Sequence, residues 1–240
     1  MKKSVIVLAA ASLGVLASCG DNTVTKNGEA FGLVHGAGYV GSATVKVEND
    51  KITAATLSEF CLPTYIVSDT ATDDTVTAEV TSHNQTVTRH FYKEVKFSTY
   101  TLTFSAEKKT YLSGETEMVA FFQSEAAAKA YAEAVLANEV AVTISGQANK
   151  TILTNEKLNK DLNGYGGERF NWKSNRDATV AAFIRHGEKL LTATQKSGSE
   201  DRKWYVDDVD TGATWVDLAS KKPNSLSYAQ LLVNALRAAK

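Results

Sequence analysis

The feature that most constrains the fold is a run of alternating apolar and polar residues near the start of the chain. Ala43, Val45 and Val47 fall on one face of an extended strand, and the residues between them are polar. Asn49 and Asp50 follow at the position of a two-residue turn, after which the alternation resumes. The pattern predicts a β-hairpin.

Three later segments have the periodicity and the capping residues of helices. The first covers residues 124–137 with Ser124 as its cap. The second begins at Ser174, with Asp177 three residues later, and ends at Gly187. The last runs from Ser227 to Ala239 and repeats apolar residues at helical spacing.

Shorter runs predict further strands. Residues 95–104 alternate and predict one strand, and residues 140–144 and 204–206 predict two short ones, whereas residues 68–88 fit either a weak strand region or a long loop. Without internal repeats, the economical interpretation is an α+β fold with an antiparallel sheet and packed helices. It covers residues 31–240, and two subdomains could meet near residues 146–153.

Composition excludes several classes of function. The chain has 26 Lys and Arg residues against 27 Asp and Glu residues, so the basic surface that nucleic-acid binding requires is missing. The two cysteines form no C-x-x-C pair, the four histidines lack the spacing of metal ligands, and no G-x-S-x-G motif occurs. We therefore expect neither a metal site nor the catalytic residues of a hydrolase.

The first residues have the pattern of an export signal. Lys2 and Lys3 precede an apolar stretch that is too short to cross a bilayer, and small residues lead to Cys19. The segment resembles the lipobox of bacterial lipoproteins, which implies a signal peptide at residues 1–18 and a diacylglycerol on Cys19. Residues 20–30 are polar and small, so we expect the lipidated cysteine and a short tether at residues 19–30. We expect a lipid-anchored protein on the extracytoplasmic face of the membrane, with Cys61 as a small buried residue.

A short motif follows the strand predicted at residues 204–206. Asp208-x-x-Thr211-Gly212-Ala213-Thr214 resembles the flavinylation motif of the FMN-binding domain family, which includes the C subunit of sodium-translocating NADH:quinone reductase and the G subunit of the Rnf complex. The hairpin GYVGSATVKVENDKIT and the spans WKSNRDATV, DTGATWVDL and SYAQLLVNALRAA are similar to FMN-binding lipoproteins of single-membrane bacteria. The resemblance covers nearly all of the mature chain except residues 68–88.

Membership of this family implies that FMN is joined through its phosphate to the hydroxyl of Thr214. A flavin transferase that uses FAD and magnesium would make this bond. Gly212 and Ala213 suit an acceptor that must enter another enzyme's active site, because they add little bulk. Thr211 can hydrogen-bond the local backbone, and Asp208 is expected to serve recognition or orientation.

Other residues near the motif have two interpretations each. The aromatic rings of Trp215, Trp172 and Tyr205 could flank the flavin, or they could belong to the core. Asn175 and Arg176 could bind phosphate or ring carbonyls at a helix start, where backbone N–H groups favour anions, or they could belong to a capped surface helix.

The predicted function is that of an electron-transfer flavoprotein more than a substrate-specific enzyme. The flavin would receive electrons from a membrane donor, either a reductase or a quinone-linked protein, and pass them to an acceptor outside the cytoplasm. Two alternatives stay open. One is a lipoprotein that binds a solute or mediates adhesion without flavin, and the other is a flavin-dependent reductase with its own substrate.

Overall fold

The computed structural model describes residues 23–82, 84–145, 147–151, 155–162, 171–196, 202–214, 216–219 and 221–240 of the 240-residue chain. The predicted signal peptide, the lipidation site Cys19 and the candidate flavin-flanking residue Trp215 lie outside these ranges. Within them, no helix has both the length and the apolar character needed to cross a bilayer.

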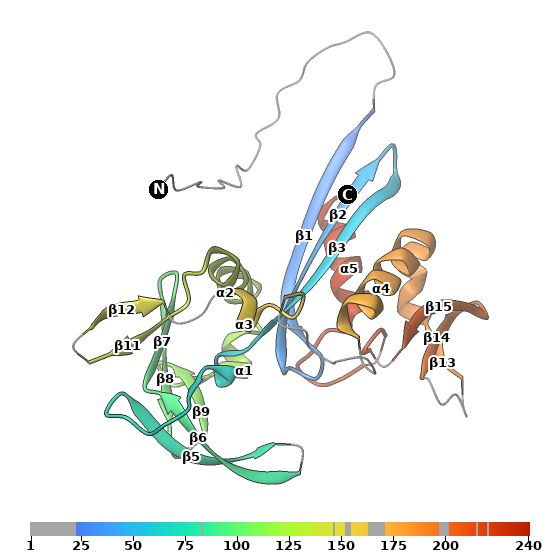
Figure 1. Cartoon of the computed structure of the whole chain (residues 1–240). Coiled ribbons are helices and arrows are strands. Elements are labelled where there is room, and N and C mark those ends of the chain that lie inside the picture. Colours follow the sequence, from blue (N-terminus) through green and yellow to red (C-terminus); the bar gives the residue numbers. More distant parts are fainter. Residues whose placement is uncertain are drawn as a thin grey trace.

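The central element is an antiparallel sheet of three long strands, β1 (Thr25–Val34), β2 (Tyr39–Glu48) and β3 (Lys51–Cys61), in that order (Figure 1). Asn49 and Asp50 connect β2 to β3 with φ angles of 48° and 62°. Both angles lie in the left-handed region that a tight hairpin turn requires. The hairpin predicted from the alternation is therefore confirmed.

The start of β1 corrects the prediction of a tether that extends to Ala30. From Thr25 onward the backbone pairs with β2, beginning opposite Glu48, although most of the first side chains are exposed. Strand pairing uses backbone N–H and C=O groups, which do not depend on apolar side chains. Polar composition alone therefore does not locate the start of the first strand.

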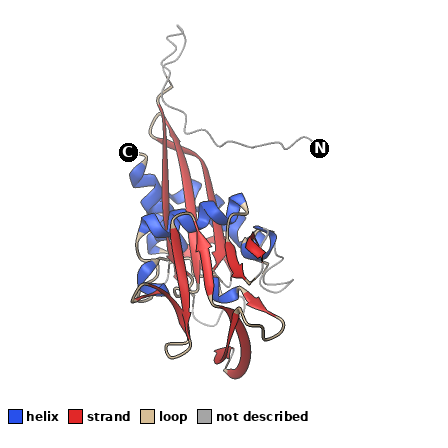
Figure 2. Ribbon diagram, turned by 90° about the vertical axis from the view of Figure 1, so that its left-hand side faces the viewer, coloured by secondary structure: helices blue, strands red, loops and turns tan. Residues whose placement is uncertain are grey.

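Helices cover both faces of this sheet (Figures 1 and 2). Helix α2 (Glu125–Ala137) lies on one face, where Lys129 pairs with Glu29 and lies over the ring of Phe31. Helices α4 (Trp172–His186) and α5 (Tyr228–Ala238) lie on the other. The sheet is consequently the middle layer of the main body, and the α+β class is confirmed.

The chain between β3 and α4 forms a second lobe, on the left of Figure 1. Its larger sheet has the order β10-β9-β8-β7-β11-β12, and its smaller sheet has the order β4-β6-β5. The elements of the lobe other than α2 are η1 (Pro63–Tyr65), β4 (Val67–Ser68), β5 (Thr75–Ser82), β6 (Gln85–Tyr92), β7 (Glu94–Phe97), β8 (Tyr100–Ser105), β9 (Thr110–Ser113), β10 (Thr116–Glu117), α1 (Met118–Phe121), β11 (Ala141–Ile144), β12 (Gln147–Thr151) and α3 (Asn155–Leu158).

The structure bears on three sequence interpretations in this lobe. Most of residues 68–88, expected as a weak strand region or a loop, form the paired strands β5 and β6. Residues 95–104 form two strands instead of one, because Ser98 adopts a φ of 48° and a turn places Phe97 opposite Tyr100. The turn changes the phase of the alternation, so apolar residues from both strands reach one buried face. Near residues 146–153, the described part includes β12, which pairs with β11.

The last part of the chain supplies a small sheet of β13 (Thr194–Gln195), β14 (Lys203–Val206) and β15 (Val209–Thr214), preceded by η2 (Gly187–Thr192). Asn171 caps α4 by accepting the N–H of Ser174 at 3.0 Å, so the helix begins earlier than Ser174, the cap predicted from the sequence. The predicted end at Gly187 and the cap Ser227 of α5 are confirmed.

A buried ion pair joins the two parts of the molecule. Glu59 on β3 is fully buried, and Lys160, where the chain returns from the second lobe, is 2% exposed. Their charged atoms lie 2.5 Å apart, and the backbone N–H of Lys160 also donates to the carbonyl oxygen of Glu59 at 2.9 Å. Burial alone would raise the pKa of the Glu59 carboxyl, but His35 and Lys160 outweigh burial and hold it below its ordinary value.

We predict that Lys160→Met lowers the free energy of unfolding by about 3–5 kcal/mol, because it leaves the Glu59 carboxylate buried without its partner. The double variant Glu59→Gln/Lys160→Met should lose less, because no buried charge is left unpaired. Urea denaturation of the three proteins measures the difference.

The pH dependence is a second readout of the same pair. The lowered pKa of Glu59 means that its charged form stabilises the wild type above the ordinary value of 4.5, and that this contribution is lost as pH falls through the folded-state pKa. Equal losses for the single and double variants, or a wild-type stability insensitive to pH below this value, would contradict the assignment.

A second stability prediction concerns Gly28 on β1. A Cβ atom there would lie 2.1 Å from the carbonyl oxygen of Ala235 on α5, and this backbone atom cannot move without displacing the helix. Gly28→Ala should therefore destabilise the fold by at least about 1–3 kcal/mol. Gly38→Ala is the matched control, because the nearest atom is 3.5 Å away. Equal urea midpoints for the two variants would refute the close approach of β1 and α5.

Candidate functional site

The predicted attachment residue lies at the end of β15, beside the first turns of α4. Thr214 is half-buried, and both its backbone N–H and its hydroxyl donate to Oδ1 of Asn175, at 2.6 and 3.2 Å. Asn175 is 6% exposed, and its Nδ2 donates to the carbonyl oxygen of Asn171, which fixes the orientation of the amide. Two residues that the sequence analysis singled out are thus in direct contact, although 39 positions separate them.

The motif begins at the tip of a β-hairpin and continues along its second strand. Asp207 and Asp208 form the tip between β14 and β15, with φ angles of 47° and 65°. Asp208 is exposed and pairs with Lys196 at 3.2 Å. It lies at the opposite end of β15 from Thr214, so any role in recognition would involve a partner protein and not contact with the hydroxyl.

The small residues of the motif alternate between two faces of β15. Thr211 and Ala213 are buried; the hydroxyl of Thr211 donates to the carbonyl oxygen of Trp204 at 2.8 Å and accepts the N–H of Ala213 at 3.2 Å. Gly212 is exposed with a φ of 78°, in the left-handed region that favours glycine. The local hydrogen bonding expected of Thr211 is therefore confirmed, and Gly212 leaves the chain beside Thr214 without a side chain.

Two other predicted cofactor residues share a carboxylate. Trp172 is 4% exposed, packs against Tyr228 and donates its indole N–H to Asp161 at 2.7 Å. Arg176 lies 2.6 Å from the same carboxylate and also pairs with Asp177. Trp172 thus occupies a core position, the second of its two interpretations, and the guanidinium of Arg176 is engaged by carboxylates rather than directed toward a phosphate.

The aromatic residue predicted on β14, Tyr205, and its neighbour Trp204 lie on opposite faces of the strand. Tyr205 is half-buried, and Lys196 lies 4.4 Å from its ring centre. Trp204 points to the other face of the strand, is 7% exposed and donates its indole N–H to the carbonyl oxygen of Val216 at 3.0 Å. Because Val216 lies two residues after Thr214, this hydrogen bond holds the segment that follows the motif.

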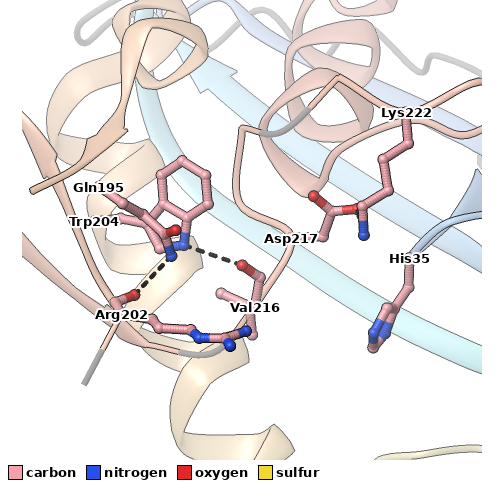
Figure 3. A pocket seen from close by; sticks show the side chains of 7 residues that line it. All are labelled: His35, Gln195, Arg202, Trp204, Val216, Asp217 and Lys222. Carbon is pink, nitrogen blue, oxygen red and sulfur yellow. Dashed lines mark hydrogen bonds and ion pairs between the residues drawn. The ribbon is translucent and has the colours of Figure 1, made fainter. Parts of the chain in front are cut away.

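Val216 and Asp217, which follow the motif, form one wall of a polar pocket with a volume of about 210 Å³ (Figure 3). The pocket brings together the turn after β1, the strands β13 and β14, and the chain between β15 and α5. The residues that line it are His35, Gln195, Arg202, Trp204, Val216, Asp217 and Lys222. No sequence pattern marks these residues as part of a site, because their positions are far apart and only the tertiary structure places them together.

The electrostatics of the pocket centre on Asp217. This residue is 5% exposed, and its carboxylate lies 3.2 Å from Nζ of Lys222. Neither carboxylate oxygen accepts a hydrogen bond from the described part of the chain. On the same side of the pocket (Figure 3), Nδ1 of His35 is buried without a hydrogen bond and lies 3.6 Å from the Glu59 carboxylate.

Comparisons with protein-family models, curated proteins and solved structures find no match to this chain. Among the residues that the structure describes, no group of three or more His, Cys, Asp or Glu side chains could hold a metal ion. Cys61 is buried and unbonded to another cysteine, as expected. The assignment of function therefore depends on the motif and on the geometry around Thr214.

The contact between Asn175 and Thr214 leads to a prediction about local order. Asn175→Leu should speed hydrogen exchange of the Thr214 amide and lower the unfolding free energy by about 1–3 kcal/mol, because a partly buried N–H loses its acceptor. Asn175→Asp keeps an acceptor oxygen at this position and should retain most of the protection. Similar exchange rates in both variants would show that Asn175 does not order the end of β15.

Proposed function

We propose that this protein is a lipid-anchored extracytoplasmic flavoprotein that carries electrons through FMN bound covalently to Thr214. The observation that carries the proposal is the complete flavinylation-type motif, whose acceptor threonine lies half-exposed at a strand end beside a glycine and an alanine. On this proposal the α+β fold is a variant of the FMN-binding domain fold, with the lobe between β3 and α4 as an addition to it.

The residues around Thr214 suit the attachment reaction. The Thr214 oxygen would form a bond to the phosphorus of the FMN half of FAD, the phosphoanhydride bond would break, AMP would leave, and the hydroxyl proton would pass to a base of the transferase. In-line approach to phosphorus demands space around the acceptor. Gly212 has no side chain, and Ala213 is turned into the core, so neither obstructs the Thr214 hydroxyl.

Asn175 has a positioning role in this proposal. Its Oδ1 holds the Thr214 hydroxyl and backbone N–H together, which restricts the side chain before it enters the transferase. Once the ester forms, the oxygen has no proton to donate, and only the backbone hydrogen bond is left. When bound, the flavin would supply the capacity to accept and release electrons.

Covalent attachment and a lipid anchor fit the same location. A dissociable cofactor stays bound only while its free concentration exceeds its dissociation constant, and the medium outside a cell dilutes it. The proposed lipid on Cys19 would keep the flavin close to a membrane donor, such as a reductase or a quinone-linked protein, and raise its effective concentration there.

The test is mass spectrometry of the full chain, purified from a host that contains a flavin transferase. We expect one FMN per chain in the wild type, with flavin fluorescence in a denaturing gel, and none in Thr214→Ala. Thr214→Ser should keep the adduct because it keeps the hydroxyl. Thr194→Ala, at an exposed threonine of the same small sheet, should be modified as fully as the wild type.

A wild-type chain that carries no flavin from this host would refute the proposal and would favour a solute-binding or adhesive lipoprotein. Flavin that persists on Thr214→Ala would instead place the attachment at another residue. An adduct on Thr214 together with rapid turnover of one small substrate would favour a reductase over a carrier.

A further inference from the structure

The polar pocket that Val216 and Asp217 line contains a carboxylate that pairs with Lys222 but accepts no hydrogen bond from the described residues. Asp217 is buried at its wall, its side chain is 3% exposed, and neither oxygen accepts a hydrogen bond within the described ranges. A buried carboxylate that lacks a donor is unfavourable unless something supplies one. Lys222 lies 3.2 Å away and balances the charge, but the missing N–H donors leave room for a ligand that provides them.

The pocket also carries a small excess of positive charge. Among the described residues that line it, Arg202 and Lys222 are cations and Asp217 is the single carboxylate, which gives a formal charge of +1 with His35 counted as neutral. Lys222 and Asp217 lie side by side in Figure 3, and His35 lies beside them on the neighbouring strand end. A matching ligand would carry an N–H donor for Asp217 and, next to that donor, atoms that gain negative charge and face the cations.

The distance from the attachment residue suits a tethered ligand. Val216 and Asp217 line the pocket and follow Thr214 by two and three positions, and even a fully extended chain spans at most about 3.6 Å per residue. Trp204 holds this segment through its hydrogen bond to the carbonyl oxygen of Val216. The backbone N–H of Tyr228, at the start of α5, donates to the carbonyl oxygen of Asp217 at 3.1 Å, so the wall is braced from two sides.

The size of the pocket limits what it can take. Its volume of about 210 Å³ is below the ~300 Å³ at which pockets for whole drug-sized ligands begin. It would therefore admit one edge of a flat ring system and leave the remainder outside, where a partner protein could approach it. An electron carrier needs such an exposed edge for exchange with its partners.

We infer that this pocket binds the pyrimidine edge of the flavin attached to Thr214 and favours its reduced form. The inference rests on the proposed function. The ring N3–H would donate to Asp217, and the N1 and O2 atoms would face the side chains of Lys222, Arg202 and His35. When an external reductant supplies two electrons and one proton is taken up at N5, negative charge develops along N1 and O2. Cations at this edge lower the free energy of that state.

The experiment compares the midpoint potentials of flavinylated full-length variants in a dithionite titration. Lys222→Gln should make the potential more negative, by up to about 30 mV, which corresponds to a tenfold change in the equilibrium of a two-electron couple. Asp217→Asn should shift it in the positive direction, because a negative charge near the reduced ring is removed. Lys221→Gln is the matched control, since it changes the same charge at an exposed neighbouring position.

The outcomes separate this inference from the proposed function. Absence of an adduct on the wild type would refute the flavin attachment itself. An adduct on every variant, with equal potentials for Lys222→Gln and Lys221→Gln, would refute the pocket as the ring site while leaving the attachment intact. Lys222 is 45% exposed, so its replacement should not prevent folding, and its result decides the question if Asp217→Asn proves unstable.

Discussion

The interaction on which the rest of the structure depends is the buried ion pair of Glu59 and Lys160. Glu59 lies near the end of β3, the last strand of the central sheet, and Lys160 lies where the chain returns from the second lobe. Tyr228 at the start of α5 donates to the same carboxylate at 2.9 Å, and His35 approaches it from the end of β1. One buried charge thus draws together the sheet, the returning chain and the helix whose first turn braces the pocket wall.

This arrangement explains why a large insertion is compatible with an ordered site. The lobe between β3 and α4 enters and leaves at nearly the same place, since Phe60 pairs with Asn159 in a single bridge. Loop-closure entropy grows only slowly with length, so a folded insertion whose ends are held together costs the main body little. In the main body, α4 packs against both β15 and α5, and Thr214 contacts Asn175.

Much of the local structure follows from patterns within short segments. The hairpin of β2 and β3, the helices α2 and α5 and the strand β14 were predicted because each signal is complete within a few residues. Two predictions failed. Residues from Thr25 onward pair as a strand despite their polar composition, and the single strand predicted at residues 95–104 is two strands because a turn at Ser98 interrupts the alternation. The Asn171 cap was missed because Ser174 carries a similar signal three residues later.

The sequence by itself determined the candidate attachment residue, the small side chains beside it and the helix that contains Asn175, because each depends on the order of neighbouring residues. Only the tertiary structure decided that Asn175 holds Thr214, that Trp204 and not Tyr205 faces the pocket, and that His35 and Asp217 share its walls. These contacts join residues from distant positions, and their geometry follows from strand pairing and core packing, which no local pattern encodes.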